Sequence, residues 1–335
     1  MTLVVERVGP SLSVQDGGRP GLLGLGLSRG GAADREAWLA GLALLGLPPG
    51  TASVEMAGLG RRFRFVSPAR FALTGAAMKA SLDDAPLEWD AAHTALAGAV
   101  LDIGAATSGV YGYLAVAGGI DTVPTLGGRG FHGIAGLGRI LQDGDRLPLA
   151  SDPARDAPPM RLPPRSRSTA PIRVMPGPQT EAFPEGVRAA FEAATFTRSP
   201  RANRQGVRLD HDGEPFSTGG QLTQVSDFIA EGDIQMTGDG APYVLLADCQ
   251  TMGGYPRIGT VIPADISRIA QASAGESLRF RFVTVEEAEA TWEGDEAIQT
   301  RLKRSLVPKV RDPREMPDLL SYDLVDRPSQ EVTDD

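Results

Sequence analysis

Hydrogen-bonding side chains that could hold a small molecule are concentrated in one segment, ADCQTMGGYPRIG at residues 247–259. An apolar run that predicts a buried strand precedes the polar residues, and a glycine pair follows them. A pocket for a carboxylate or an amide needs oriented hydrogen-bonding groups and a close approach of the backbone, which glycine permits. A purely structural turn would not need so many polar side chains, so we interpret this segment as part of a binding pocket. Its candidate members are Asp248, Gln250, Thr251, Gly253, Gly254 and Tyr255.

Two arginine-containing segments could supply positive charge to an anionic ligand. In VQDGGRPG, at residues 14–21, Asp16 and Arg19 lie in a glycine-rich turn that would hold a carboxylate and a guanidinium close together. In NRQGVRL, at residues 203–209, Arg204 could pair with an anionic substrate or intermediate through a two-pronged contact. Both segments also have a plainer interpretation, in which Asp16 accepts from its own backbone and the two arginines are solvated.

Several other kinds of site are excluded by the residues present. The chain has only three lysines and none follows a glycine, so a Walker phosphate loop of the GxxxxGK[ST] kind is absent from the sequence. The three histidines are scattered without ligand-like spacing, and we predict no metal site. The net charge of −9 repels nucleic-acid phosphates and anionic membrane surfaces alike, so neither is an expected partner.

The cysteine content and the apolar stretches predict the cellular environment. Cys249 is the only cysteine, which rules out an internal disulfide and fits a reducing cytoplasm. The first ten residues lack the basic and apolar regions of a signal peptide. The most apolar stretches, 38–47 and 110–120, have about half the ~20 residues that a membrane-spanning helix needs. We therefore expect a cytoplasmic protein without a membrane segment.

Composition and periodicity favour a mainly β, α+β fold with short covering helices. The 41 glycines and 26 prolines among 335 residues are typical of short elements separated by turns and disfavour a helical bundle. Runs of β-branched and aromatic residues predict strands at 63–66, 70–74, 100–103, 111–117, 172–175, 243–247, 259–262 and 278–283. Apolar spacing and end signals predict helices over 33–45 and 184–194, one starting at Pro263, and one from the capping box Thr284-x-x-Glu287 to about Arg304.

The segment 151–170 is rich in proline and arginine and carries almost no apolar pattern, which is typical of a linker. We therefore predict one unit over 1–150 and a second over 171–307, followed by a polar, poorly ordered tail over 308–335. Both units contain a strand, a Gly-Gly pair, a Pro-x-x-Gly turn and an Arg-Ile-x-Gln segment in the same order. This shared order suggests duplication of one β-rich unit.

Taken together, these segments resemble a known family. VQDGGRPG, SRGGAADREA, AVAGGID, VPTLGGR, IRVMPGPQ, NRQGVRL and ADCQTMGGYPRIGTVIPADI occur in the order found in the KipA-like proteins. That family is also called allophanate hydrolase subunit 2, the biotin-dependent carboxyltransferase family, or the 5-oxoprolinase C subunit. The resemblance covers about residues 5–287, and its most specific part is the Gln-Thr-x-Gly-Gly-Tyr-Pro run. It implies a fold of two cyclophilin-like β-barrel units.

The activity implied by the resemblance is that of a hydrolase subunit that works only with partner subunits. A KipI-like B subunit and a LamB/YcsF-like A subunit would join it in the ATP-dependent opening of 5-oxo-L-proline to L-glutamate. The carbonyl carbon of a lactam is a poor electrophile, so phosphorylation of its oxygen would help, and the developing charge would need arginine and backbone donors. Because this chain has no Walker loop, ATP would be used by the complex.

Under this resemblance, Arg204 and Arg19 would stabilise anionic oxygen, and Asp248 would orient the substrate or act as a base. The substrate-binding group would comprise Asp16, Gln179, Gln250, Thr251, Gly253, Gly254 and Tyr255. Two alternatives stay open. One is the carboxyltransferase subunit of a biotin-dependent urea or allophanate-type carboxylase, with biotin on a separate carrier. The other is a non-catalytic KipA-type antagonist of a KipI-like kinase inhibitor.

Overall fold

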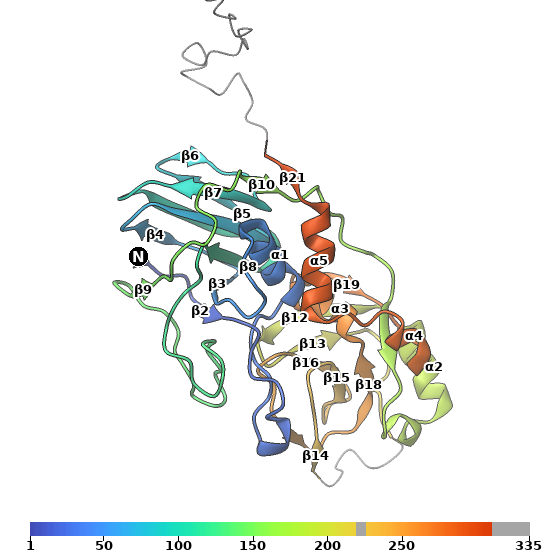
Figure 1. Cartoon of the computed structure of the whole chain (residues 1–335). Coiled ribbons are helices and arrows are strands. Elements are labelled where there is room, and N and C mark those ends of the chain that lie inside the picture. The colour runs from blue at the N-terminus through green and yellow to red at the C-terminus, as the bar shows by residue number, and fades with distance from the viewer. Residues whose placement is uncertain (219–225, 310–335) are drawn as a thin grey trace, which may run out of the picture.

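The computed structural model describes residues 1–218 and 226–309, which are built around two large β-sheets (Figure 1). The first sheet takes its strands from the N-terminal half and from one short strand near residue 308. The second takes its strands from the region between Ile172 and Phe282. Helices are few and short, and they lie between or against the sheets (Figure 1). The prediction of a mainly β fold with short covering helices is confirmed.

The first sheet curls into a nearly closed barrel around a long antiparallel pair, β5 and β8. Among the described residues it has eleven strands, and its main path runs β21-β10-β7-β5-β8-β4-β1-β9. The strands are β1 (Thr2–Arg7), β2 (Leu12–Gln15), β3 (Ser53–Ala57), β4 (Arg62–Phe65), β5 (Ala69–Leu82), β6 (Ala85–Pro86), β7 (Ala91–Ala95), β8 (Val100–Val116), β9 (Arg146–Pro148), β10 (Met160–Arg161) and β21 (Val307–Pro308). The start of β8 pairs with β4 and its end pairs with β3, so this strand links different parts of the barrel wall.

Strand β8 replaces the two strands predicted at 100–103 and 111–117, and that prediction was wrong in detail. The glycines between the two runs suggested a break, but β5 pairs with β8 on both sides of them. Bulges in this pairing absorb the irregularity. At one bulge Gly75 has a φ of +84°, and a Cβ there would lie 2.5 Å from the Tyr111 carbonyl oxygen. Glycine is therefore required at this bend of the barrel.

The second sheet has eight strands among the described residues, in the order β19-β12-β13-β16-β15-β18-β11-β20. They are β11 (Ile172–Met175), β12 (Phe196–Asn203), β13 (Gly206–Asp210), β15 (Asp233–Met236), β16 (Pro242–Leu245), β18 (Arg257–Val261), β19 (Ser277–Leu278) and β20 (Phe280–Phe282). The β11–β20 pair is parallel, whereas the other pairs are antiparallel. Strands β14 (Asp227–Phe228) and β17 (Met252–Gly253) form a separate two-stranded sheet.

The ends of the predicted helices lie within two residues of the observed ends, with one exception. They are α1 (Arg35–Leu45), α2 (Glu185–Ala193), α3 (Pro263–Gln271), α4 (Val285–Glu289) and α5 (Asp295–Ser305), with 3-10 turns η1 (Leu23–Leu25) and η2 (Thr180–Ala182). The capping box of Thr284 and Glu287 is confirmed. The single helix predicted from there to about Arg304 is wrong, because Gly294 adopts an extended conformation and starts a new helix, α5.

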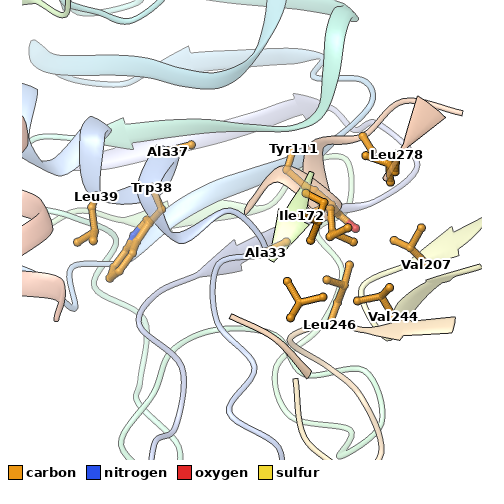
Figure 2. Close-up of a cluster of buried hydrophobic side chains, with 14 of the residues drawn as sticks. Ala33, Ala37, Trp38, Leu39, Tyr111, Ile172, Val207, Val244, Leu246 and Leu278 are labelled. Atoms are coloured by element: carbon orange, nitrogen blue, oxygen red, sulfur yellow. The ribbon is translucent and has the colours of Figure 1, made fainter. Parts of the chain in front are cut away.

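One hydrophobic cluster extends across both halves of the chain (Figure 2). Trp38 and Leu39 of α1 belong to it, and so do Ile172, Val207 and Val244 of the second sheet. Helix α1 is buried along most of its length because the first sheet covers one side and α5 packs on it as well. Separating the halves would expose this apolar surface to water, so the shared core fixes their relative position. A second cluster fills the barrel.

Segments beyond the predicted first unit, 1–150, also contribute strands to the first sheet. Strand β10, inside the predicted linker 151–170, pairs with β7 and with β21, so this segment and residues 307–308 join the first sheet. The predicted tail over 308–335 lies outside the described residues after Lys309. In the described part of the chain, no helix is long and apolar enough to cross a membrane.

The returning strand β21 brings Lys309 against His93, a buried residue of β7. His93 Nε2 lies 2.8 Å from the Glu88 carbonyl oxygen, and Nδ1 lies 3.0 Å from the Lys309 ammonium. Burial, and then the charge of Lys309, lower the pKa of His93 to about 4. The imidazole is therefore neutral at pH 7.

We expect His93 to make the fold less stable in mild acid. An unfolded histidine titrates near 6.5, so the stability that this side chain contributes is complete above pH 6.5 and is lost as the pH falls toward 4. The loss should reach about 2–3 kcal/mol. Urea titrations at pH 7.5 and 4.5 should show the wild type losing more free energy of unfolding than His93→Gln, which does not titrate. Equal losses in the two proteins would contradict this assignment.

Candidate functional site

Arg204 lies at the centre of a buried network of charges where the two halves meet. It occupies the tight turn between β12 and β13. Its Nε and Nη2 atoms donate to the two carboxylate oxygens of Asp248, each at 2.9 Å. Nη2 also donates to the Gly31 carbonyl oxygen at 2.6 Å, and Nη1 donates to Glu55 of β3. One guanidinium thus joins a carboxylate of its own half to a carboxylate and a carbonyl of the other half.

The three charges are almost completely removed from water. The exposed fractions of the side chains are 13% for Arg204, 2% for Glu55 and 3% for Asp248. Burial alone would lower the pKa of Arg204, but the carboxylates of Glu55 and Asp248 outweigh it and hold that pKa well above its usual value. A cation in such a site stays charged and needs both partners.

Glu55 connects the Arg204 network to the start of α1 through hydrogen bonds. Its Oε2 accepts from the Tyr113 hydroxyl at 2.7 Å and from the Ala33 amide at 2.8 Å. The Tyr113 hydroxyl in turn accepts from the Asp34 amide at 2.8 Å. Asp34 caps the helix by accepting from the Ala37 amide, and it also accepts from Gln271 of α3 at 2.8 Å. Burial raises the pKa of Asp34, although its hydrogen bonds act in the opposite direction.

The structure places Asp16 and Arg19 in loop-holding contacts. Asp16 accepts from the Gly18 amide at 2.9 Å and from the Arg129 amide at 2.5 Å. Arg19 is buried and donates to the carbonyl oxygens of Thr125, Gly128 and Gly130 at 2.9, 3.3 and 2.9 Å. The plain interpretation holds for Asp16, which bonds backbone amides, whereas Arg19 is buried rather than solvated. These contacts make Arg19 a positioning residue for the loop over 125–130.

Ser28 and His132 form a buried pair that the sequence analysis did not include among the site residues. Ser28 Oγ lies 2.9 Å from His132 Nε2 and donates to the Cys249 carbonyl oxygen at 2.7 Å. Because the hydroxyl proton is used by that carbonyl, His132 Nε2 must carry the proton in the bond to Ser28. His132 Nδ1 then accepts from the Ala135 amide at 3.3 Å. In this arrangement the histidine is not a base toward the serine, and the pair ties two loops to the turn at Cys249 that follows β16.

The remaining predicted residues are Gln179, which bonds the backbone of β18, and five residues that follow Cys249 in the chain. Gln179 accepts from the Arg257 amide at 2.9 Å. Gln250 and Tyr255 are exposed, whereas Thr251 and Gly254 are partly exposed. A Cβ on Gly253 would lie 2.6 Å from Gln235 Nε2. The close packing of this side chain therefore explains the need for glycine without a ligand. The segment that follows Asp248 therefore runs outward, away from the buried network.

The structure brings Arg204 and Asp248 together but does not gather all the predicted residues around one cavity. A pocket of about 320 Å³ lies between the two halves, and Asp16 is the one predicted residue among those lining it in the described chain. The other charged residues of this pocket, Arg29, Arg35 and Glu231, were not predicted. Substrate contact by Arg204 and Asp248 stays a prediction and requires their mutual pair to open.

Comparisons with known proteins identify the family of this chain. A family model described as "Carboxyltransferase domain, subdomain A and B" matches residues 25–282. The chain belongs to this carboxyltransferase family. Within the family, it is 36% identical to the 5-oxoprolinase C subunit of Escherichia coli K12, over 85% of this chain and 93% of that protein. It is 32% identical to the Haemophilus influenzae protein of the same name, over 82% of this chain and 89% of that one. The resemblance identified from the sequence motifs is therefore confirmed.

Solved structures of longer chains share the carboxyltransferase fold. The crystal structure of TTHA0988 matches with a TM-score of 0.76 at 31% identity, over 84% of this chain and 55% of that one. The urea carboxylase of Kluyveromyces lactis matches with a TM-score of 0.79 at 24% identity, over 93% of this chain and 31% of that one, and this likeness concerns the fold alone. The chain thus spans about half of TTHA0988 and a smaller part of the carboxylase. A cyclophilin-like character of the two units stays a prediction.

Replacing Arg204 should destabilise the whole fold. Arg204→Met leaves Glu55 and Asp248 as buried carboxylates without a cation, which costs about 3–5 kcal/mol of unfolding free energy. Arg62→Met, which removes an exposed ion pair with Asp102, is the matched control and should change stability little. Urea unfolding followed by circular dichroism measures both. A loss for Arg204→Met no larger than that for Arg62→Met would contradict the role given to the network.

Proposed function

We propose that this chain is the C subunit of an ATP-dependent 5-oxoprolinase, which opens 5-oxo-L-proline to L-glutamate together with a KipI-like and a LamB/YcsF-like subunit. The observation that carries the proposal is the 36% identity to the Escherichia coli 5-oxoprolinase C subunit over 93% of that protein. Similarity over nearly the full length of a relative that is itself named as one subunit favours the same role in a complex of the same kind.

ATP does not fit the charged residues around the pocket of this chain. A triphosphate needs several backbone amides or a surplus of basic groups in one cradle. The pocket between the halves holds Arg29 and Arg35, but Glu231 lines it too and Asp295 binds both arginines. The sequence also lacks a Walker loop. We therefore propose that the complex binds ATP on another subunit, and we assign no step to the nucleotide here.

Exposed apolar side chains offer a surface for a partner subunit. Leu25 and Val123 are 83% and 87% exposed, and Leu126 and Ile134 are exposed as well. They lie on two loops that Arg19 and the Ser28–His132 pair join, on the lower side of the molecule in Figure 1. TTHA0988 carries additional chain next to a unit of this fold, which supports a protein partner. We propose that these loops contact another subunit of the complex.

A second candidate function rests on a different relative. The chain is 31% identical, over 81% of its length, to a putative urea carboxylase of Emericella nidulans, although it spans 23% of that protein. This similarity supports a carboxyltransferase subunit that receives carboxyl groups from biotin on a separate carrier. Carboxylation that depends on an added biotin carrier and on this chain would favour it over the lactamase.

Reconstitution tests the proposed function. The chain is expressed with a KipI-like and a LamB/YcsF-like subunit from the same source, and ATP-dependent release of glutamate from 5-oxoproline is measured. We expect activity from the full set and at least about a hundredfold less when this chain is omitted, since a reaction that needs an assembled site loses its oriented groups. Activity that persists without this chain would reject the proposal.

The same reconstitution examines the partner surface with a matched pair of variants. Leu25→Asp with Val123→Asp should weaken co-purification of the partner, because charges would be buried in the contact. Leu96→Asp is the control, since Leu96 is 73% exposed just after β7, in a segment that belongs to neither loop. Equal co-purification of both variants would place the contact elsewhere.

A further inference from the structure

A small pocket lies beside the Arg204 network, between the two halves of the chain. Its volume of about 320 Å³ is near the lower end for ligand pockets, which suits a small metabolite. Trp38 of α1 and Ile262 before α3 contribute apolar walls, and Trp292, 64% exposed, lies at its rim. Gly30 also lines the pocket, and a Cβ on it would lie 3.6 Å from Asp248 Oδ1. The pocket and the charge network are therefore direct neighbours.

Two arginines of the first half bring cationic groups to this pocket. Arg29 Nε donates to the Gly17 carbonyl oxygen at 3.0 Å, and Arg29 Nη2 lies 3.5 Å from Asp295. Arg35 donates through Nε to the same Asp295. Within the described residues, Arg29 Nη1 and both terminal nitrogens of Arg35 make no hydrogen bond to protein. A bound carboxylate would give these donors a partner.

Glu231, just before β15, faces the two arginines from the second half. Its carboxyl group has no hydrogen bond to any other described residue, although it lines the same pocket. Burial raises the pKa of Glu231, while Arg29, Arg204 and Arg35 act to lower it. The neutral form is thus favoured relative to an exposed glutamate. Asp16 also lines the pocket, with its carboxylate bonded to the Gly18 and Arg129 amides, and Asp295 binds both arginines. The lining therefore has no surplus of positive charge, and the guanidinium donors of Arg29 and Arg35 are what it offers to a ligand carboxylate.

A cyclic amide with a carboxylate complements these groups. A lactam holds its N–H and C=O on the same edge, so a neutral carboxyl group can pair with both through two hydrogen bonds. The carboxylate of the ligand would meet the free donors of Arg29 and Arg35. The ring carbons would contact Trp38 and Ile262.

We propose that this pocket binds a small cyclic amide bearing a carboxylate, the class to which 5-oxoproline belongs. The choice of this substrate class rests on the proposed function, whereas the pocket and its charges do not. Arg29, Arg35 and Glu231 would be the recognising residues.

Calorimetric titration of the full chain with 5-oxo-L-proline tests the proposal, with the KM for 5-oxoproline of the reconstituted complex as a second measurement. Arg35→Met and Glu231→Leu should each weaken binding, or raise KM, by about tenfold or more, since each removes a charged or paired hydrogen bond. Glu231→Gln should stay within about threefold, because an amide also offers one donor edge and one acceptor. Arg62→Met, outside the pocket, should match the wild type. Thermal melting checks that every variant is folded.

The proposal is overturned if folded Arg35→Met and Glu231→Leu bind 5-oxo-L-proline like the wild type. It is equally overturned if the full chain does not bind the lactam and the variants leave the KM of the complex unchanged. Either result, in a complex that still needs this chain for activity, leaves the proposed function intact and rejects the pocket alone. A complex that works without the chain rejects the proposed function whatever the titrations give.

Discussion

The buried guanidinium of Arg204 is the constraint on which the joint arrangement of the two sheets depends. It comes from a turn of the second sheet, binds Asp248 of the same half, and reaches Glu55 and the Gly31 carbonyl of the first half. A cation removed from water is tolerated only while all its partners stay in place, so this contact resists separation of the halves. Glu55 extends the constraint to Tyr113 and to the start of α1, the helix that leads into the shared hydrophobic core.

This joint also fixes the position of the proposed ligand pocket. The backbone from Arg29 to Gly31 contacts the network on one side and lines the pocket between the halves on the other, so the pocket depends on the closed joint. The loops held by Arg19 and by the Ser28–His132 pair expose apolar side chains. A firmly held centre with a small pocket, and separate loops with exposed apolar side chains, fit the proposed role as a subunit of a larger enzyme.

Local signals predicted much of the fold, whereas the partners of the charged residues depend on contacts between distant segments. The strand at 172–175 and the capping box at Thr284 follow from neighbouring residues alone, and both are confirmed. Arg204 and Asp248 were singled out separately, but their mutual pairing was not predicted, and Glu55 gave no signal because it lies in an ordinary strand pattern. The pocket residues Arg29, Arg35 and Glu231 come together only through the packing of the two halves. The length of β8 was missed for the same reason, since its partner β5 and not its own glycines determines where it ends.

Native-state hydrogen exchange across the joint tests the account most directly. Leu42 in α1 and Val244 in β16 are both fully buried and belong to the core that the two halves share. If the Arg204 contacts and this core make the halves one cooperative unit, the opening free energies of the two amides should agree within about 1 kcal/mol and equal that of global unfolding. An opening free energy at Val244 several kcal/mol lower than that at Leu42 would contradict the account, because the second half would then unfold while the first remained intact.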